Sequence, residues 1–515
     1  MTGTAFSVNE NFVYDCNGGV MAKKIIIIGG GIAGLSAGVY ACLSGYEVDI
    51  YEKNSIIGGE CTGWNRKGLH IDNCIHWLTG TRKDTELYKV WCKVGALSED
   101  TEYVNGDAFY SSVSNGVKVT LWADLERTKK ELLTISPEDR DEIERFIRYV
   151  EYSKQCLFPA DKPMDLWTIK DYIKIGMAMK DFGPISKEFR KVSLEEYAGR
   201  FKHPAIQKLM CDYLPKEYCA YSFFVSYATV VDGNGNIPMG ASLQMSLRMA
   251  NRCKELGGNI HVAQMVKSIN VEKGKVVGIT LGDNTKVEAD YVISAIDTHT
   301  LFNKLIDNRY LPKSLKSAYE SPEKYPTTSG FQVAFGIPFD GRKQDETVFI
   351  DIEPLKAENT FIDRMYVKIY GYDDIYIKDG KCVMQTCLTQ SDADYAYWKS
   401  LSKRDYEENK KNLVAEIMKR ICSQFPAYED NIEYLDAWTP LTYERYCNAY
   451  HGSYMSFITT PQGKQIQLNG RIKGIKNLYL AGQWVNSPGG LPVAVSSGKF
   501  AVQRILKSEK RDISI

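Results

Sequence analysis

Three closely spaced glycines lie near the start of the chain, directly after a short apolar run. Gly29, Gly31 and Gly34 form a GxGxxG pattern that follows the stretch 25–28, which is four isoleucines. The first glycine of such a pattern permits a tight turn, the second lets the backbone approach a pyrophosphate, and the third allows close helix–strand packing. The following helix presents free N–H groups to the phosphate. The pattern predicts a dinucleotide-binding loop; a glycine turn without a ligand is the alternative.

An acidic residue follows at the spacing that such a loop needs. The predicted second strand, 47–51, ends at Glu52. This is close to the roughly 20-residue separation expected for the acid that binds a ribose hydroxyl. A carboxylate here fits FAD or NAD and disfavours NADP. Gly58 and Gly59 then bring a second stretch of backbone toward the same nucleotide.

Candidates for catalytic side chains lie in two further segments. His76 is in DNCIHW, and an imidazole there could relay a proton near neutral pH. The alternative is a buried histidine that packs against Trp77. Arg445 and Tyr446, in TPLTYERY, are the next candidates.

A second glycine-rich loop lies near the C-terminus. The stretch 478–480 predicts a strand that Gly482 ends, and Gly489 and Gly490 precede a predicted helix over 494–506. A glycine-lined helix N-terminus can face a phosphate or a flavin carbonyl. A plain strand–loop–helix that ends the fold is the alternative.

Length, charge and cysteine usage limit the class of protein. A chain of 515 residues predicts two or three domains. The 64 basic and 64 acidic residues balance, which gives no support for nucleic-acid binding. The 13 cysteines lack CxxC pairs and the six histidines lack metal-ligand spacing, so we expect reduced thiols, a cytoplasmic location and no metal site. Residues 1–20 have no secretion signal, and we expect a poorly ordered extension.

The remaining chain predicts a mixture of helices and strands. No apolar run reaches the roughly 18 residues that span a bilayer. The stretch 164–179 mixes apolar and basic residues, which predicts an amphipathic helix packed on a core or lying on a membrane surface. We expect mainly helix over 82–160 and helices over 241–256 and 403–423. We expect strands over 259–262, 266–271, 276–280, 287–295, 329–339, 347–352, 363–369 and 383–388.

Four separated blocks together resemble the FAD-dependent phytoene desaturase, carotenoid isomerase and retinol saturase family, within the amine-oxidase-like flavoproteins. The blocks are GGGIAGLSAG with Glu52, the Gly58–Gly59 pair with the element from Gly68 to Asp72, GGNIHVAQMVKSI, and NLYLAGQW with GGLPVAVSSG. The resemblance implies an α/β fold with a discontinuous Rossmann-like FAD-binding domain and a second, mixed-sheet α+β substrate domain. The FAD-binding domain would comprise 21–100, 238–305 and 465–515. The substrate domain would comprise 101–237, with a helical insertion, and 306–464.

The resemblance also implies residue roles. Glu52 would bind the ribose, Val266 would contact the adenine through its backbone, and His76 would lie near the flavin ring. The other residues implied around FAD are Gly29, Gly31, Ile32, Ala33, Gly34, Lys53, Gly58, Gly59, Ala295, Gly482, Gln483, Leu491, Val493 and Ala494.

The chain departs from the family in two places. It has Glu60 where the family usually has an arginine that faces the phosphates, and Arg66 or Lys53 would then have to compensate. It has Pro492–Val493 where the family often has Pro–Gly. No cysteine lies near 482–498, so we expect non-covalent FAD.

The function that the resemblance implies is oxidoreduction at carbon–carbon double bonds of an apolar polyene or unsaturated lipid, by desaturation, saturation or isomerisation. A flavin amine or amino-acid oxidase is one alternative, and a non-catalytic prenyl-binding escort protein of the same fold is another. The implied partner is an apolar small molecule, with peripheral membrane contact and no nucleic acid. The electron acceptor and the oligomeric state stay open.

Overall fold

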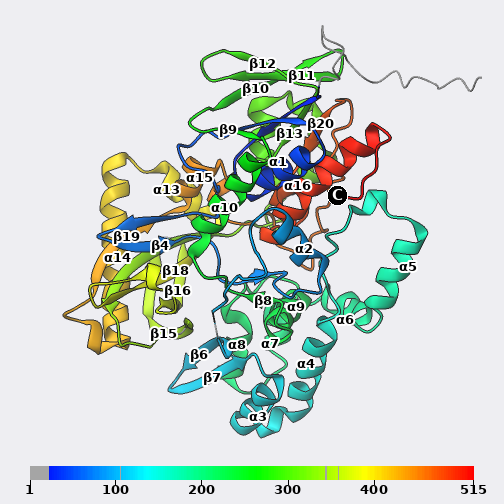
Figure 1. Cartoon of the computed structure of the whole chain (residues 1–515). Helices are drawn as coiled ribbons and strands as arrows, with labels where there is room; N and C mark the ends of the chain where they lie inside the picture. The colour runs from blue at the N-terminus through cyan, green and yellow to red at the C-terminus, as the bar shows by residue number, and fades with distance from the viewer. Residues whose placement is uncertain (1–21, 105, 343–344, 358) are drawn as a thin grey trace, which may run out of the picture.

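The computed structural model describes residues 22–515 except 105, 343–344 and 358, so the expected extension over 1–20 lies outside the described residues. Five short strands form a parallel sheet, in the order β20–β13–β1–β2–β9 (Figure 1). All four isoleucines of the central strand are buried, as expected for a parallel strand covered on both faces. The strands are β1 (Lys24–Ile28), β2 (Glu47–Tyr51), β9 (Asn259–His261), β13 (Tyr291–Ser294) and β20 (Leu478–Leu480).

Three helices pack on this sheet, and the first of them also packs closely against the other two. They are α1 (Ile32–Leu43), α10 (Ala241–Glu255) and α16 (Leu491–Ser508). Two glycines make the close contacts possible. A Cβ at Gly498 of α16 would lie 2.4 Å from the carbonyl oxygen of Ala33, and a Cβ at Gly38 of α1 would lie 2.7 Å from Cδ1 of Ile50. The helices therefore fix the N-terminus of α1 over the end of β1.

A small antiparallel sheet extends from the parallel one, at the top of Figure 1. It contains β10 (Val266–Glu272), β11 (Lys275–Leu281) and β12 (Lys286–Glu288). The single strand expected over 287–295 is therefore wrong: its first part ends β12 and its second part is β13 of the parallel sheet.

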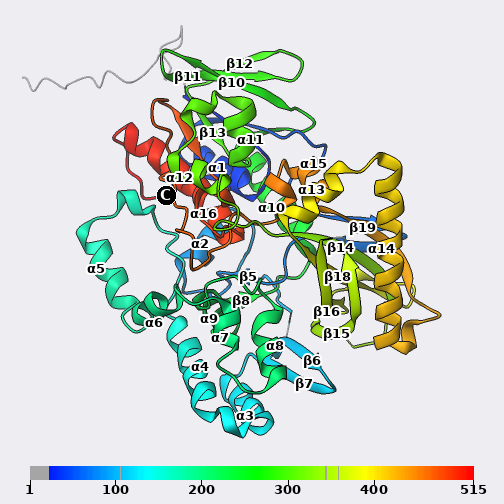
Figure 2. The same cartoon turned by 180° about the vertical axis from the view of Figure 1, so that it is seen from behind.

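The largest sheet has eight strands, and α14 (Lys403–Gln424) packs against one of its faces (Figure 2). The order is β19–β14–β18–β16–β15–β6–β7, and β17 pairs with β18. Its pairs are antiparallel except for β15–β6. The strands are β6 (Ala108–Ser114), β7 (Val117–Trp122), β14 (Ser329–Pro338), β15 (Asp345–Ala357), β16 (Thr360–Tyr370), β17 (Ile377–Lys378), β18 (Lys381–Gln390) and β19 (Glu433–Trp438).

Helices form the lower part of the molecule around a core rich in phenylalanine and tyrosine (Figure 1). They are α3 (Leu125–Ile135), α4 (Arg140–Ser153), α6 (Phe182–Phe189), α7 (Leu194–Ala198), α8 (Pro204–Asp212) and α9 (Tyr221–Val231), whereas α5 (Ile169–Ala178) contributes no residue to this core. The expectation of mainly helix over 82–160 is wrong at 108–122, where β6 and β7 form a hairpin that joins the large sheet. The expected helix over 164–179 is also divided, into a 3-10 turn at Met164–Leu166 and α5.

The expected fold class is confirmed: a Rossmann-like parallel sheet accompanies a second, mixed sheet. The exact division into domains stays a prediction. Across the described part of the chain, no helix has both the length and the apolar character needed to cross a bilayer. Shorter elements complete the fold: α2 (Glu86–Lys93), α11 (Thr298–Thr300), α12 (Lys313–Tyr319), α13 (Asp392–Ser400), α15 (Pro440–Cys447), β3 (Gly63–Arg66), β4 (Leu69–Asp72), β5 (Leu78–Thr79) and β8 (Gly235–Asn236).

Candidate functional site

The glycine loop joins β1 to α1 and lies at the carboxyl end of the parallel sheet. Gly29 has a φ of +102°, which favours glycine, and its N–H donates to the carbonyl of Tyr51 at 2.9 Å. A Cβ at Gly34 would lie 1.9 Å from the carbonyl oxygen of Gly29, so this glycine serves helix–strand packing. At Gly31 the nearest atom to an added Cβ would be 3.7 Å away, which leaves its surface open. A ligand can therefore approach the loop at Gly31.

Glu52 connects this loop to the end of β2. Its Oε2 accepts from the N–H of Gly30 at 2.8 Å, and its Oε1 accepts from the backbone N–H and the side chain of Asn54 at 2.9 and 2.8 Å. The carboxylate is buried and lines the cavity described next. The carboxylate is thus placed where a ribose hydroxyl in the cavity could donate a further hydrogen bond to it.

A cavity of about 390 Å³ opens above the glycine loop. Segments far apart in the chain form its wall. Of the residues predicted around the cofactor, those that line it are Gly29, Gly31, Ile32, Ala33, Glu52, Lys53, Gly58, Gly59, Val266, Ala295, Gly482, Gln483, Leu491 and Ala494. Gly34 and Val493 do not line it, because Gly34 lies beneath the loop and Val493 is buried in the adjoining core. We call this space the cofactor cavity.

Two of the predicted catalytic residues lie at the outer edge of the cofactor cavity. Tyr446 lines it and is half exposed, and the exposed guanidinium of Arg445 lies 4.6 Å from the centre of the Tyr446 ring. Nζ of Lys53 donates to the carbonyl of Arg445 at 2.7 Å and to Oδ1 of Asn448 at 2.9 Å. The structure therefore does not bring Arg445 and Tyr446 beside His76, and their position does not favour a catalytic role.

The compensation expected for the missing arginine is not found at Arg66. Its Nε lies 2.9 Å from Oδ2 of Asp436, and its side chain does not line the cofactor cavity. Lys53 does line the cavity, but its ammonium group ties β2 to the loop after α15.

A second cavity, of about 670 Å³, lies beside the first and borders the large sheet. We call it the substrate cavity. Its wall contains many aromatic and aliphatic side chains: Trp77, Tyr213, Phe349, Phe361, Ile362, Tyr366, Leu388, Tyr443, Tyr454, Met455, Leu491 and Pro492. Glu60, Cys74, Tyr454, Gly490 and Leu491 line both cavities, so the two spaces meet at these residues.

His76 lines the substrate cavity and is absent from the wall of the cofactor cavity. Its Nδ1 lies 3.0 Å from the hydroxyl of Tyr366. Burial, with a smaller effect of the Lys368 ammonium, lowers the pKa of His76 to about 3. Its imidazole is therefore neutral near pH 7. The contact with Tyr366 takes the place of the expected packing on Trp77, whose ring packs against Phe109 and Tyr213.

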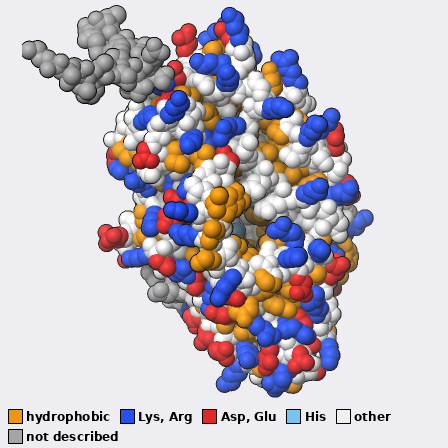
Figure 3. Space-filling view, turned by 90° about the vertical axis from the view of Figure 1, so that its right-hand side faces the viewer, with side chains coloured by type: hydrophobic (Ala, Val, Ile, Leu, Met, Phe, Trp, Pro, Cys, Tyr) orange, Lys and Arg blue, Asp and Glu red, His pale blue; other side chains and the backbone are white. Residues whose placement is uncertain are grey.

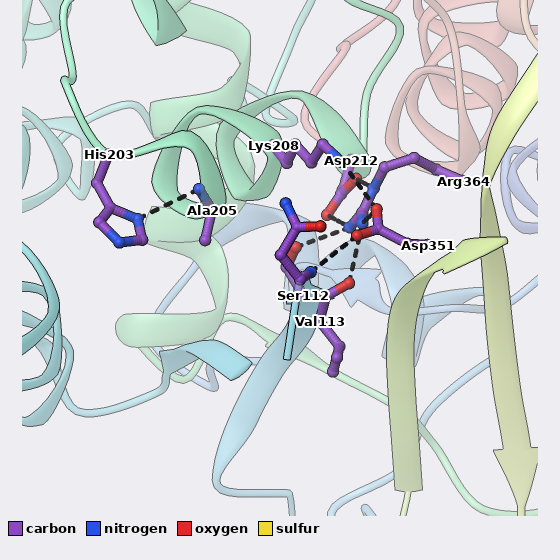
Figure 4. A network of polar contacts seen from close by, with 9 residues as sticks. Ser112, Val113, His203, Ala205, Lys208, Asp212, Asp351 and Arg364 are labelled. Carbon is purple, nitrogen blue, oxygen red and sulfur yellow. Dashed lines mark hydrogen bonds and ion pairs between the residues drawn. The ribbon is translucent and has the colours of Figure 1, made fainter. Parts of the chain in front are cut away.

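A charged network lies at one side of the substrate cavity (Figure 4). Nε and Nη2 of Arg364 donate to the two carboxylate oxygens of Asp212 at 2.7 and 2.5 Å. Nη1 donates to Asp351 and to the carbonyl of Val113, and Nη2 also donates to Oγ of Ser112. All five N–H groups of this guanidinium are thus engaged within the protein. The network serves to hold the cavity wall.

The residues and cavities fit a flavin dinucleotide. The open surface at Gly31, the free N-terminus of α1 and the carboxylate at Glu52 together suit a pyrophosphate and a ribose. Gly482 and Gly490, both with positive φ, keep the opposite wall free of side chains. The apolar space beyond would receive the substrate.

Comparison with known proteins defines the class. The pattern of the flavin-containing amine oxidoreductase family matches residues 32–506, and the chain belongs to this family. It is therefore a flavin-dependent oxidoreductase. It is similar to 4,4′-diaponeurosporene oxygenase of Staphylococcus aureus, strains MW2 and USA300, with 22% identity over 96% of this chain and 100% of those proteins.

Solved structures share the fold. An oxidoreductase from Methanosarcina mazei has a TM-score of 0.58 at 17% identity, covering 94% of this chain and 100% of that one. Putrescine oxidase bound to putrescine has a TM-score of 0.57 at 14% identity, covering 95% and 99%. Cyclohexylamine oxidase from Brevibacterium oxydans has a TM-score of 0.54 at 13% identity, covering 95% and 100%.

Several residues of the site were not singled out from the sequence. Tyr443 lies in TPLTYERY, the segment in which the predicted catalytic residues are Arg445 and Tyr446. In α15 the buried Tyr443 faces the substrate cavity, while Arg445 and Tyr446 lie on the exposed side. Helical spacing separates Arg445 from Tyr443 but places Tyr446 on nearly the same face as Tyr443, so spacing alone does not show which residue faces the site. The others are Asn54, Tyr366, Arg364 and Tyr454, which carry no local signal.

Proposed function

We propose that this flavoenzyme binds FAD and adds, removes or shifts hydrogens at carbon–carbon double bonds of an apolar polyene or unsaturated lipid. The observation that carries the proposal is the large aromatic substrate cavity that meets the glycine-lined cofactor cavity. The staphylococcal relatives, named as oxygenases of 4,4′-diaponeurosporene, support a polyene of this kind.

The protein's own part in such a reaction is binding, orientation and exclusion of water. When bound, the flavin supplies the two-electron chemistry. Gly31 and the N-terminus of α1 would hold the pyrophosphate, and Glu52 would accept from the ribose. The aromatic wall would align an extended chain, and neutral His76, beside Tyr366, would add a polar contact that requires no buried cation.

Amine oxidation is the second candidate function. Tyr443 and Tyr454 both line the substrate cavity, with ring centres 6.3 Å apart, and paired aromatic rings attract a cationic amine. However, the rings are tilted by 56°, and the hydroxyl of Tyr443 is occupied by Gln332, Trp438 and Asn73. The two tyrosines are therefore a weak indication of amine binding, and the wide apolar wall of the substrate cavity is a stronger indication of polyene binding.

The experiment is anaerobic incubation of the flavin-loaded protein with 4,4′-diaponeurosporene, putrescine and cyclohexylamine in parallel. We expect the polyene alone to change the flavin absorbance or to be converted to a product that chromatography separates. Flavin bleaching by an amine, with no conversion of the polyene, would support the second candidate. A folded protein that stays colourless and takes up no FAD would instead support the escort protein.

We further propose that FAD is held without a covalent bond. Three thiols, those of Cys61, Cys74 and Cys447, line the cofactor cavity. The pKa of Cys74 is raised by the neighbouring Cys61 and by burial, and burial raises the pKa of Cys447. A protonated thiol is a poor nucleophile, so Cys74 and Cys447 are poorly suited to flavin attachment. Acid precipitation is expected to release all the flavin; yellow colour in the pellet would contradict the proposal.

The same substrate class suggests peripheral contact with a membrane, and we propose α5 as the contact. None of its ten residues is buried. Four large apolar residues at helical spacing are strongly exposed, by 79%, 51%, 57% and 68%: Ile169, Tyr172, Ile173 and Met177. Figure 3 views the side of the molecule on which α5 lies, and hydrophobic side chains gather there beside lysines and arginines and a hollow.

The charges around α5 fit an anionic bilayer. Lys170, Lys174 and Lys180 are exposed and, within the described residues, form no ion pair. The acid on the helix, Asp171, is occupied by Lys162 and by the capping residue Thr168. An apolar stripe flanked by free lysines is the arrangement of helices that lie in a lipid interface.

Co-sedimentation with vesicles tests this contact. We expect binding to vesicles that contain phosphatidylserine, weaker binding to pure phosphatidylcholine, and loss of binding in an Ile173→Glu/Met177→Glu variant. The matched control is Leu43→Glu, an exposed leucine at the end of α1. Unchanged sedimentation of the double variant would contradict the proposal, and a concentration-dependent dimer that it abolishes would assign α5 to self-association.

A further inference from the structure

Glu60 stands at the point where the two cavities meet. It follows the Gly58–Gly59 pair and contributes to both walls. Of the described acidic residues, Glu52 and Asp297 line only the cofactor cavity, and Asp212 and Asp363 line only the substrate cavity. The carboxyl group of Glu60 is thus the one acid of the described chain that borders both spaces.

The contacts of Glu60 fix the position of its side chain but provide no positive charge to balance a carboxylate. Its Oε2 accepts from Nε2 of Gln483 at 3.1 Å, and its backbone carbonyl accepts from Nδ2 of Asn73 at 3.0 Å. Oε1 of Gln483 in turn accepts from the N–H of Gly490 at 3.2 Å, which ties the carboxyl to the loop before α16. Within the described residues, Oε1 of Glu60 has no hydrogen-bond partner and no cation pairs with the group.

Three of the other four acids in the two walls are held by hydrogen-bond donors, and the fourth, Asp363, is exposed. Asp212 is held by Arg364, and Glu52 accepts from the N–H groups of Gly30 and Asn54. Asp297 accepts from the N–H groups of Thr300 and Tyr450. The carboxyl group of Glu60 accepts a hydrogen bond only from the neutral amide of Gln483.

The surroundings of Glu60 favour its protonated form. Burial raises its pKa to about 8; the Gln483 amide opposes this rise and Asp297 adds to it. The other titratable groups that face it are Cys74, Tyr443 and Cys447, each with a raised pKa and therefore neutral. At pH 7 Glu60 is thus mostly a carboxylic acid, whereas neutral His76 has no proton to give as an imidazolium.

We propose that Glu60 is the acid–base residue of this enzyme, and that its Oε1 exchanges a proton with the substrate where the two cavities meet. The O–H bond of the carboxyl breaks, a bond forms between that proton and a substrate atom, and a carboxylate is left. The electron pair of a substrate double bond forms this new C–H bond, and the carboxylate then takes a proton from the carbon on the other side, so that the double bond shifts and the acid is restored. This role rests on the proposed function, because the substrate is the chain that fills the substrate cavity.

Infrared spectroscopy of the flavin-loaded protein tests the protonation state without any substrate. The expected result is a protonated-carboxyl C=O band that disappears with a midpoint near pH 8. This band should be missing in Glu60→Gln and retained in Glu142→Gln, a buried glutamate outside both cavities. A wild-type spectrum in which Glu60→Gln removes no such band would overturn the proposal.

Turnover of the polyene tests the catalytic role. General acid–base groups contribute about 10²–10⁴-fold, so Glu60→Gln should lose about that factor while retaining its flavin. Glu60→Asp should recover part of the rate and shift the alkaline limb of the pH–rate profile. Wild-type rates in Glu60→Gln would overturn the proposal; if that variant loses its flavin, an unshifted pH profile in Glu60→Asp would do so. If wild-type protein does not convert a polyene, the proposed substrate fails, while the infrared titration still decides the state of Glu60.

Discussion

The hydroxyl of Tyr366, on β16, lies 3.0 Å from Nδ1 of His76 inside the substrate cavity. Because the imidazole is neutral near pH 7, this contact is an ordinary hydrogen bond between uncharged groups. Loss of one such bond costs about 1 kcal/mol, or about a five-fold change in rate if it orients substrate. We therefore expect Tyr366→Phe to reduce turnover by about five-fold and to leave the flavin absorbance unchanged. A shifted flavin spectrum would place His76 and Tyr366 at the cofactor instead.

His76 also predicts how stability depends on pH. In the unfolded chain it binds a proton below its ordinary pKa of 6.5, whereas in the folded protein it stays neutral down to about pH 3. The unfolded state thus binds more protons in this window, and the free energy of unfolding falls as the pH decreases from 6.5 toward 3. His76→Gln should show a smaller loss between pH 7 and 5 in urea unfolding. His203→Gln, outside both cavities, is the control; equal losses in the two variants would contradict the prediction.

Glu52 is expected to contribute directly to flavin affinity. Glu52→Ala removes the acceptor for Gly30 and Asn54 as well as the predicted ribose partner. Unmatched buried donors cost about 1–3 kcal/mol, so flavin should bind about 5–150 times more weakly. Titration of the apoprotein with FAD measures this. Glu47→Ala, an exposed acid on the same strand, should bind as the wild type does; a wild-type affinity in Glu52→Ala would show that the carboxylate makes no contact with the cofactor.

Gly31 and Gly34 should respond differently to alanine. A Cβ at Gly34 would lie 1.9 Å from the carbonyl oxygen of Gly29, so Gly34→Ala must displace α1 and lower the stability of the protein even without flavin. Gly31→Ala has room for its methyl group and a φ of −78°, so its apoprotein should melt as the wild type does. Its flavin affinity should fall, because the methyl group enters the cavity. Thermal melting of both apoproteins and FAD titration separate the two roles; equal melting temperatures would contradict the packing role of Gly34.

Arg364 is expected to be structural. Its removal leaves Asp212, which is almost fully buried, without its cation. Breaking a buried ion pair in this way typically costs about 3–5 kcal/mol. Urea unfolding of Arg364→Ala should show a loss of that order, and Arg342→Ala, an exposed arginine paired with Asp340, should lose less than about 1 kcal/mol. Turnover lost without any loss of stability would instead make Arg364 a substrate ligand.

The amino-acid sequence determined the individual strands, helices and turns, because these depend on interactions between residues only a few positions apart. The isoleucine run, the three glycines and the spacing to Glu52 predicted a unit of strand, loop, helix and second strand. All four parts of this unit occur as expected. The alternating stretches at 329–339 and 383–388 likewise became paired strands. The motifs at both ends of the chain also indicated a flavoprotein family, which the family match confirms.

Tertiary structure decided which of these elements meet. The parallel pairing of β15 with β6, which carries the hairpin at 108–122 into the large sheet, joins residues more than 200 positions apart. Such pairing depends on packing rather than on local pattern, as does the side of α15 that faces the substrate cavity. The same holds for Glu60: the sequence marked it only as a departure from the family. Its raised pKa follows from burial at the meeting of two cavities, where no cation lies nearby to oppose the effect, and only the folded chain brings this about.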